Sequence, residues 1–386
     1  MTRVAMIASS YLPHLGGVEE HVLHVADALV RRGHDVVVWT VEQNGTAPVT
    51  GGPAPVRHLP CPMPNMSPGG AARWAAAYPD ARRAWQRAFE ADRPEVLDIQ
   101  CYGPNGPYAT ALARRTGTPL VYSNHGETFM DAHGSFDTSL LLRRTLARTL
   151  KAADAVTSCS AFAAADLGRF GPTTAPVTIV GNGIDLEQTP APVDEPLPAR
   201  YVAGVGRLVA NKGFDTLLDA YAALGRDDLD VVIVGDGPYR AELASRATAL
   251  GIADRVRFLG ARSRGEVRTV LDGATAHVVP SHVEAFGIVI LEGWRSGVPV
   301  VCTRVGGPPE FVTDDEDGLL FDPRSPDDLA QCLRRLLDDD GLRARIGEAG
   351  RRRAASFTWD TVADRYEETF AVAGDAAPDR ARRRRA

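Results

Sequence analysis

Two glutamates, Glu284 and Glu292, stand eight residues apart around a glycine and an apolar run. A strand-like run, 276–280, comes just before them, so the order along the chain is strand, short loop, glutamate, glycine and helix. A helix that begins at this glycine would offer unpaired amides and the positive end of its dipole to an anion. Because side chains on a helix lean toward its N-terminus, Glu292 can reach back toward Glu284. The pattern indicates a ligand with a phosphate between two sets of hydroxyls, which is the layout of a nucleotide-diphosphate sugar.

Two cations and a histidine follow other strand-like runs. Arg207 and Lys212 come after the run 201–205. Cations near a helix start oppose the helix dipole unless they share an anion, so this pair suggests a diphosphate clamp that could replace a metal ion. His125 comes after the run 119–123, where it could exchange a hydrogen bond with a sugar hydroxyl or a reacting oxygen. The position of His125 alone favours a structural role.

Glycines also follow several strand-like runs. Gly17 stands between the first strand and a helical pattern, where its backbone could approach a ligand closely. Gly235 belongs to a Gly-Asp-Gly turn, for which a structural role is favoured over a nucleotide contact. Gly306 and Gly307 fit a ligand contact and a plain turn equally well.

The composition excludes several other kinds of protein. The net charge of −6, from 43 basic and 49 acidic residues, argues against a general nucleic-acid binder. The five cysteines are scattered without CxxC spacing, which indicates reduced thiols in a cytoplasmic protein. Neither a signal peptide nor a run of ~18 apolar residues is recognised. Zinc-type spacing is absent and the acidic run 338–340 reads as solvated charge, so no metal or other cofactor is expected.

The alternation of short β-branched runs with helical patterns predicts an α/β protein with parallel sheets. Strands are predicted at 4–8, 35–40, 96–100, 119–123, 155–158, 177–180, 201–205, 230–234, 256–259, 276–279 and 298–302. The length favours two domains. A proline-rich stretch then divides the series, so we expect a first domain at 1–187, a linker at 188–198 and a second domain at 199–357. Both are expected to be doubly wound, with their sheets facing a central cleft.

The C-terminus is expected to contain a helix at about 358–373 that packs back on the first domain. A basic, disordered tail is expected at 374–386. The arginines of this tail could contact an anionic lipid surface. A solubilising end is favoured over peripheral membrane contact, because no amphipathic apolar helix accompanies the charges.

Taken together, these motifs resemble the retaining family 4 glycosyltransferases of the GT-B fold, with two Rossmann-like domains. The resemblance covers nearly the whole chain, and its specificity comes from the order and spacing of motifs that are each weak alone. They are Gly16-Gly17, Arg32-Gly-His34, His125-Gly126, Asn182-Gly-Ile-Asp185, Gly206-Arg207, Lys212-Gly213, Gly235-Asp-Gly237, Glu284 to Glu292, Gly297-Val-Pro299 and Gly306-Gly307.

The resemblance implies a role for each matching position. Glu284 would contact hydroxyls of the transferred sugar, and Glu292 would hold the ribose. The amides of Gly287, Ile288 and Val289 would hold the distal phosphate and sugar, and Arg207 and Lys212 would hold the diphosphate. Gly17 would lie in a loop that closes over donor and acceptor, and His125 would lie near the donor sugar. The first domain would bind the acceptor and the second the donor. Enzymes of this kind generally need no metal.

The sequence departs from the family pattern at two places. Trp294 and Arg295 stand where the family commonly has small residues, and Pro308-Pro309 crowd the Gly306-Gly307 loop. The motifs also contain no evident carboxylate nucleophile for a double displacement. We therefore expect same-face transfer, in which the phosphate leaving oxygen helps to deprotonate the acceptor.

The leading hypothesis is transfer of a hexose from a UDP- or GDP-linked sugar to a hydroxyl of an acceptor. One alternative is a nucleotide-sugar epimerase on a similar two-domain fold. Another is a non-catalytic protein that binds nucleotide sugars. The sequence leaves the acceptor open among a lipid, a polysaccharide end, an inositol phosphate and a small natural product.

Overall fold

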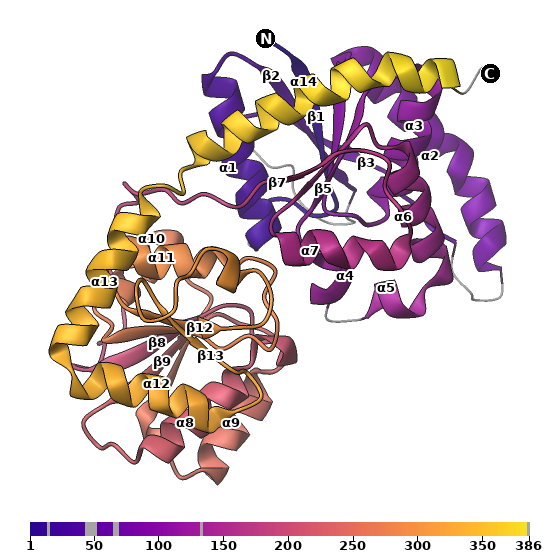
Figure 1. The fold of residues 1–386 in the computed structure, drawn as a ribbon. Coiled ribbons are helices and arrows are strands. Elements are labelled where there is room, and N and C mark those ends of the chain that lie inside the picture. The colour runs from indigo at the N-terminus through magenta and orange to yellow at the C-terminus, as the bar shows by residue number, and fades with distance from the viewer. Residues whose placement is uncertain (14–15, 43–51, 65–68, 132–133, 384–386) are drawn as a thin grey trace. The chain divides into compact units, whose positions relative to one another are not determined.

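The computed structural model describes residues 1–13, 16–42, 52–64, 69–131 and 134–383, with the backbone alone for 378–383. The chain forms two compact units. The first comprises Met1–Gly181 together with Trp359–Ala386, and the second comprises Asn182–Thr358. In Figure 1 each unit has its own sheet with helices packed against it.

The first unit is built on a seven-stranded parallel sheet with the order β3-β2-β1-β4-β5-β6-β7. Its strands are β1 (Arg3–Ala8), β2 (Asp35–Val41), β3 (Val56–Leu59), β4 (Val96–Gln100), β5 (Leu120–Asn124), β6 (Ala155–Ser158) and β7 (Val177–Ile179). Val4 of β1 pairs with Val36 on one side and with Val96 on the other. The central strands are buried on both faces, as expected for β-branched runs in a parallel sheet that helices cover.

The helices of the first unit connect these strands and cover the sheet (Figure 1). They are α1 (Gly17–Arg31), α2 (Gly70–Asp92), α3 (Asn105–Thr116), α4 (Glu127–Met130), α5 (Ser135–Thr138), α6 (Leu140–Ala152), α7 (Ala161–Asp166), the 3₁₀ helix η1 (Leu167–Phe170) and the C-terminal α14 (Trp359–Arg383).

The second unit is built on a six-stranded parallel sheet with the order β10-β9-β8-β11-β12-β13. Its strands are β8 (Tyr201–Val205), β9 (Asp230–Val234), β10 (Val256–Gly260), β11 (Ala276–Val279), β12 (Val300–Thr303) and β13 (Leu319–Phe321). Its helices are η2 (Ala210–Lys212), α8 (Phe214–Leu224), α9 (Arg240–Ala249), η3 (Ala253–Arg255), α10 (Arg264–Asp272), α11 (Ile288–Arg295), η4 (Pro308–Glu310), α12 (Pro326–Asp338) and α13 (Asp340–Ala354). The prediction of two doubly wound parallel sheets is confirmed.

The strand order reverses once in each sheet. The reversal lies between β1 and β4 in the first unit and between β8 and β11 in the second. Loops that leave two such strands diverge to opposite faces of the sheet and leave a crevice at its carboxyl edge. Functional side chains are therefore expected at these two switch points.

The change from the first unit to the second lies after Gly181, a few residues before the boundary suggested by the prolines. The predicted linker 188–198 is not a free connection, because it is bound to α10 of the second unit. The Ala191 amide donates to the Gly265 carbonyl at 2.9 Å, and the Thr269 hydroxyl donates to the Ala191 carbonyl at 2.6 Å. A side chain on Gly265 would collide with Ala191, so this glycine allows the close packing.

Helix α14 belongs to the first unit, where it packs on α1 and across β4, β5 and β6. It continues to Arg383, well beyond the predicted end at about 373, so residues 374–383 are helical where a disordered tail was predicted. The apolar stripe explains the difference, because Tyr366, Phe370, Ala373 and Ala377 are all buried at helical spacing. Residues 384–386 and the side chains of 378–383, which carry the predicted basic run, lie outside the described part.

Arg32, at the end of α1, is the main polar contact with α14. Its guanidinium donates to Asp364 at 2.5 Å, to Glu367 at 2.8 Å and to the Asp360 carbonyl at 2.7 Å. Its side chain is 24% exposed, so the contacts are only partly screened by solvent.

Replacing Arg32 by alanine is expected to loosen α14, lowering the free energy of unfolding by about 1 kcal/mol. Amide hydrogen exchange along α14 should speed up, and less strongly in high salt. Arg365→Ala is the matched control, because Arg365 pairs with Glu368 within α14 itself and is exposed. Equal exchange rates in the two variants would contradict the docking role of Arg32.

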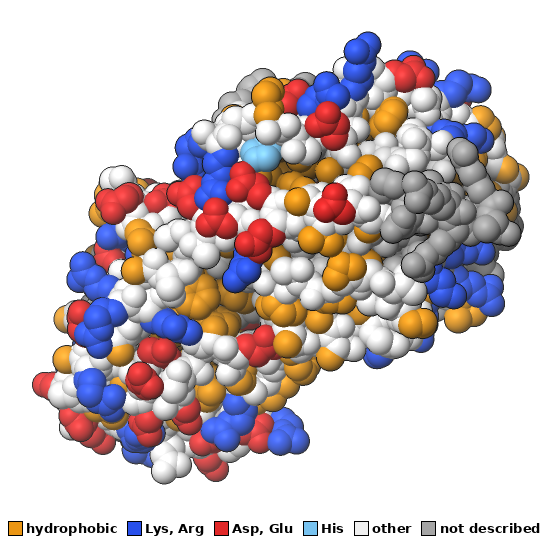
Figure 2. Space-filling model, turned by 45° about the horizontal axis from the view of Figure 1, so that its top comes forward, with side chains coloured by type: hydrophobic (Ala, Val, Ile, Leu, Met, Phe, Trp, Pro, Cys, Tyr) orange, Lys and Arg blue, Asp and Glu red, His pale blue; other side chains and the backbone are white. Residues whose placement is uncertain are grey.

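Across the described residues, no helix has both the length and the apolar character needed to cross a membrane. Figure 2 shows acidic and basic side chains interspersed over the face in view.

Candidate active site

The switch point of the second unit gathers four of the predicted residues. Arg207 and Lys212 follow β8, and Glu284 and Gly287 follow β11, its neighbour in the sheet. The register pairs Val278 of β11 with Gly204 of β8, so both strands end at the same edge. The sequence thus places two cations and a carboxylate at the carboxyl edge, where ligands of such sheets bind.

Glu284 and Lys212 form a partly buried ion pair. Lys212 Nζ lies 2.5 Å from Glu284 Oε2, and Ser281 Oγ donates to the same oxygen at 2.9 Å. The exposed fractions of the two side chains are 19% for Lys212 and 7% for Glu284. These contacts leave Oε1 of Glu284 without a hydrogen-bond partner within the described residues. The charges are therefore fixed in place before any ligand arrives, and one carboxylate oxygen is left to accept from it.

The backbone of Glu284 is bound to the loop that follows β12. The Glu284 amide donates to the Val305 carbonyl at 3.2 Å, and the Gly307 amide donates to the Glu284 carbonyl at 2.9 Å. Gly306 has a φ of +115°, and a Cβ on it would lie 1.9 Å from the Glu284 carbonyl oxygen. Gly306 and Gly307 thus form the turn that holds the backbone of Glu284, and a contact of these glycines with a ligand stays a prediction.

Helix α11 begins at the predicted turn. Gly287 is its N-cap with a φ of +92°, and Ile288 and Val289 open the helix with no acidic residue in the first turn. Their amides lack intrahelical partners, so they can donate hydrogen bonds to an anion. Glu292 lies in the second turn, partly buried. Burial lowers the pKa of the Arg295 guanidinium, and the charge of Glu292 offsets only part of this effect.

Arg207 and Gly235 lie beside each other through backbone packing. Gly235 has a φ of +135°, and a Cβ there would lie 1.9 Å from the Gly206 carbonyl oxygen. Gly235 is thus needed for the close backbone packing against Gly206, which agrees with the structural role favoured for this turn. The side chain of Arg207 is exposed, and no described residue forms a hydrogen bond or ion pair with it.

The two large residues after Glu292 are accommodated by packing. Trp294 is fully buried and donates to the Asp317 carbonyl at 2.8 Å. A side chain on Gly350 would lie 2.3 Å from the Trp294 ring, so the missing side chain makes the room. Arg295 donates to the Asp185 carbonyl at 3.1 Å. Pro308 and Pro309 begin the short helix η4, where proline costs no hydrogen bond.

In the first unit, Gly17 is the first residue of α1. The first turn of this helix carries Glu19 and Glu20, whose charges oppose a phosphate at the helix N-terminus. A Cβ on Gly16 would lie 2.6 Å from Glu19 Oε2. The start of α11 is therefore electrostatically better suited to an anion than the start of α1.

His125 lies just after β5 and is held at both its backbone and its ring. Its amide donates to Glu127 Oε2 at 2.8 Å, and its Nε2 lies 2.8 Å from Gln100 Oε1. Burial, with a smaller contribution from nearby His21, lowers the pKa of His125 well below its usual value. The imidazole is therefore neutral at neutral pH.

The sequence reasoning missed the polar residues behind His125. Gln100 contacts Asp98 of the same strand and Tyr366 of α14, and Asp98 also accepts from Ser123 of β5. Burial raises the pKa of Asp98 to about 7. Two polar residues inside the apolar strand β4 were a usable signal, because a central strand rarely carries them without a purpose. No local signal connects Tyr366, which comes from the far end of the chain.

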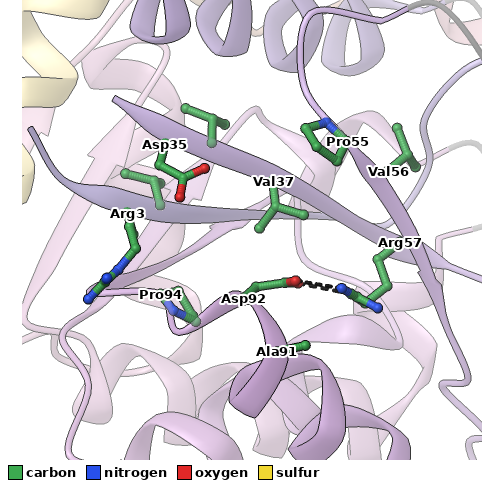
Figure 3. A pocket seen from close by; sticks show the side chains of 11 residues that line it. Arg3, Asp35, Val37, Pro55, Val56, Arg57, Ala91, Asp92 and Pro94 are labelled. Carbon is green, nitrogen blue, oxygen red and sulfur yellow. Dashed lines mark hydrogen bonds and ion pairs between the residues drawn. The ribbon is translucent and has the colours of Figure 1, made fainter. Parts of the chain in front are cut away.

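Figure 3 shows a pocket of about 320 Å³ in the first unit, at the edge where β1, β2 and β3 begin. Arg57 pairs with Asp92 across it, as the dashed line marks, and Arg3 pairs with Glu95 nearby. This is the amino edge of the strands, opposite the edge that carries His125 and Gln100. None of the predicted site residues lines this pocket.

Among the described residues, no group of three or more His, Cys, Asp and Glu side chains is placed to hold a metal ion. Arg207 and Lys212 place two positive charges at the carboxyl edge of the second unit, after β8.

Two family models together span most of the chain. The model described as Glycosyltransferase Family 4 matches residues 15–188, and the model described as Glycosyl transferases group 1 matches residues 187–353. Glycogen synthase of Mycobacterium tuberculosis is 31% identical over 398 residues, which cover 96% of this chain and 95% of that protein. D-inositol 3-phosphate glycosyltransferase of Corynebacterium diphtheriae is 31% identical over 411 residues, with coverages of 97% and 95%.

Solved structures support the same architecture. Sucrose-phosphate synthase from Thermosynechococcus elongatus matches with a TM-score of 0.80 and 22% identity, over 96% of this chain and 98% of that one. HepE of Anabaena, solved in complex with UDP-glucose, matches with a TM-score of 0.75 and 22% identity, over 95% and 99%. At these identities the likeness establishes the GT-B fold. The identity across nearly the full length of the curated relatives establishes more: the chain belongs to glycosyltransferase family 4 and is a glycosyltransferase that uses a nucleotide-sugar donor.

Proposed function

We propose that this glycosyltransferase moves a hexose from a UDP- or GDP-linked sugar to a hydroxyl of its acceptor, with retention of configuration and without a metal. The observation that carries the proposal is the Lys212–Glu284 ion pair beside the start of α11, at the switch point of the second unit. The ion pair provides a cation and a carboxylate, and the start of α11 provides free amides at the same edge of the sheet. A diphosphate with a sugar on one side requires these three kinds of group.

The proposed donor contacts all come from the second unit. Lys212 and Arg207 offset the charge of the diphosphate, and the amides of Ile288 and Val289, which follow Gly287, bind the distal phosphate. The free oxygen of Glu284 accepts from hydroxyls of the sugar. Glu292 binds the ribose, one turn further along the helix. Gly235 contributes by allowing the loop of Arg207 to pack closely.

The first unit is proposed to bind the acceptor. His125 is proposed to act on the transferred sugar or on the acceptor hydroxyl, since its neutral ring can accept a hydrogen bond. Gly17 is proposed to let the loop before α1 approach the substrates. The acidic first turn of α1 favours a hydroxyl-rich partner there over a phosphate.

The proposed chemistry is a same-face exchange at the anomeric carbon. The bond from this carbon to the phosphate oxygen breaks, and the acceptor oxygen bonds to the same face. The departing phosphate oxygen takes the acceptor proton, so the products are the glycoside and the nucleoside diphosphate. Lys212 and Arg207 stabilise the negative charge that grows on the leaving diphosphate, as a metal would do elsewhere.

The names of the relatives suggest acceptors for testing. One is called a glycogen synthase and another a D-inositol 3-phosphate glycosyltransferase, so a glucan end and an inositol phosphate are the first two acceptors to try. HepE was solved in complex with UDP-glucose, which makes this the first donor to try.

The proposal is tested by a thermal-shift screen of UDP-, GDP- and dTDP-linked sugars. A donor at about 100 times its dissociation constant should raise the free energy of unfolding by about 2.7 kcal/mol. Glu292→Ala should weaken the shift even when the ligand is a nucleoside diphosphate without the sugar, because Glu292 is proposed to bind the ribose. Transfer to each acceptor is then followed by NMR with and without EDTA, and the anomeric signal reports retention or inversion.

Four results would contradict parts of the proposal. An inverted product excludes retention, and loss of transfer in EDTA excludes metal independence. A donor converted to its epimer without acceptor would support the epimerase alternative, while binding with no turnover on any acceptor would support a non-catalytic role.

A further inference from the structure

Behind His125 lies a cluster of polar side chains that the proposed chemistry leaves unexplained. Asp98 and Gln100 of β4 and Ser123 of β5 are fully buried, and Tyr366 of α14 is nearly so. Gln100 is the last residue of β4, the strand beside the switch point of the first unit. Burying an acid and an amide costs free energy unless both are hydrogen-bonded, and apolar residues at these positions would avoid that cost.

The hydrogen bonds fix the direction of the Gln100 amide. Asp98 accepts from Ser123 Oγ at 2.8 Å through one oxygen and from Gln100 Nε2 at 2.6 Å through the other. Above its pKa of about 7, Asp98 is an ionised carboxylate that can only accept, so the amide must point its nitrogen at Asp98. Gln100 Oε1 then faces the opposite way, toward His125.

This direction determines where His125 carries its proton. Gln100 Oε1 lies 2.8 Å from His125 Nε2, and a carbonyl oxygen can only accept, so Nε2 must donate. Because burial keeps His125 neutral, its other nitrogen, Nδ1, then carries a lone pair. Within the described residues Nδ1 has no hydrogen-bond partner.

We propose that the Asp98–Gln100 pair fixes His125 as the tautomer protonated on Nε2, so that Nδ1 is the atom that accepts a hydrogen bond from the sugar or the acceptor hydroxyl. The second half of this inference rests on the function proposed above for His125. Asp98 and Gln100 are positioning residues, since they act through the imidazole.

Helix α14 completes the cluster. Tyr366 OH lies 3.1 Å from Gln100 Nε2 and 2.8 Å from His21 Nε2, with a longer contact of 3.4 Å to Gln100 Oε1. The His21 ring meets the His125 ring edge-on at 4.6 Å between centroids. Among the described residues, the ionisable groups around the cluster include His21 of α1, Asp98 of β4 and Tyr366 of α14. Glu127 is bound to the His125 backbone, and the partly buried Cys101 follows Gln100. The return of the C-terminal helix to the first unit closes this cluster from solvent.

The tautomer can be read directly by long-range ¹⁵N–¹H NMR of the ¹⁵N-histidine-labelled full chain. The spectrum is recorded at pH 8, above the Asp98 pKa of about 7, and the His125 signals are assigned by their loss in His125→Gln. We expect a protonated Nε2 and a bare Nδ1 in the wild type. A protonated Nδ1 would overturn the proposal without any reference to activity.

Asp98→Asn is the decisive variant, because it keeps the shape of the side chain but allows the Gln100 amide to turn over. We expect the Nδ1-protonated tautomer to become populated and kcat with UDP-glucose to fall roughly ten- to a hundredfold, as when other groups that orient a functional imidazole are removed, with KM nearly unchanged. Thr110→Val is the matched control: it removes another buried hydrogen bond of the first unit, to Thr149, and should change neither the tautomer nor kcat.

The outcomes distinguish the tautomer of His125 from the role of its Nδ1 in the reaction. A shifted tautomer with unchanged kcat in Asp98→Asn would show that Nδ1 does not meet the substrates. An unshifted tautomer in Asp98→Asn would show that Asp98 does not set it. If the wild type turns over no donor sugar, the proposed function fails, and the NMR spectrum still decides the tautomer.

Discussion

Replacing Lys212 by methionine is expected to lower turnover of the nucleotide-sugar donor roughly a hundred- to a thousandfold, the usual loss when a preorganised charge at a reacting centre is removed. The charge that grows on the leaving diphosphate would lose the cation that Glu284 holds in place. Arg207 would remain, but its side chain is exposed, and no described residue forms a hydrogen bond or ion pair with it. Glu284 would also lose the ion-pair partner whose Nζ lies 2.5 Å from its Oε2. Steady-state kinetics of nucleoside diphosphate release measures the effect.

The same replacement should also destabilise the second unit. It leaves the Glu284 carboxylate, 7% exposed, with Ser281 as its remaining partner, at a cost of about 2–3 kcal/mol. Adding Glu284→Gln to Lys212→Met should recover much of this stability but none of the activity. Recovery of both would show that Lys212 serves Glu284 and not the donor.

The chain offers an unusually clean test, because it contains two lysines, Lys212 and Lys151. Lys151 lies on the exposed side of α6 in the first unit, so Lys151→Met is the matched control and should leave turnover unchanged. Amine acetylation followed by mass spectrometry then compares the two directly. Bound donor should slow modification of Lys212 and leave Lys151 unaffected, whereas equal rates at Lys212 with and without donor would contradict the diphosphate role.

Replacing Gly306 by alanine is expected to cost at least about 3 kcal/mol of stability and to lower turnover strongly. The new Cβ would lie 1.9 Å from the Glu284 carbonyl oxygen, far inside contact distance, and the φ of +115° is itself unfavourable for alanine. Relief requires the loop of Glu284 to move, and a displacement of about 1 Å at a reacting centre can cost about a hundredfold in rate. Chemical denaturation and donor kinetics measure both losses.

Gly225→Ala separates the clash from the backbone strain. Gly225 also has a positive φ, +60°, at the end of α8, but a Cβ there would meet nothing within 4 Å. Its cost should therefore be about 1–2 kcal/mol with normal turnover. If Gly306→Ala cost no more than this control, the contact between its loop and Glu284 would not position the carboxylate.

The local pattern was sufficient for the regular elements of both sheets. The strands β6, β8, β9 and β11 lie where their β-branched runs predict them, because a strand buried on both faces must be apolar throughout. Two strands were not predicted, β3 (Val56–Leu59) and β13 (Leu319–Phe321). Both lie at sheet edges and are short, so pairing to a neighbour defines them more than their own composition does.

Contacts between segments that are distant in the sequence were not predictable from the local pattern. The composition of the proline-rich stretch 188–198 predicts a linker, yet its backbone is bound to α10. The residues of the stretch do not indicate this contact. The end of α14 was misplaced for a related reason, since Ala373 and Ala377 read as weakly apolar until the sheet they cover is known.

The sequence by itself determined the alternation of strands and helices, and with it the two parallel sheets, the family, and the order of Arg207, Lys212, Glu284 and Glu292 along the chain. These follow from spacing and residue type, which need no long-range contact. Only the tertiary structure decided which groups meet: Lys212 with Glu284 across the switch point, Gly306 beneath the Glu284 carbonyl, and Tyr366 against Gln100 behind His125. The physical reason is that hydrogen bonds, ion pairs and close backbone packing depend on distances of a few ångströms between segments that lie 72, 22 and 266 residues apart, and local residue preferences do not encode such distances.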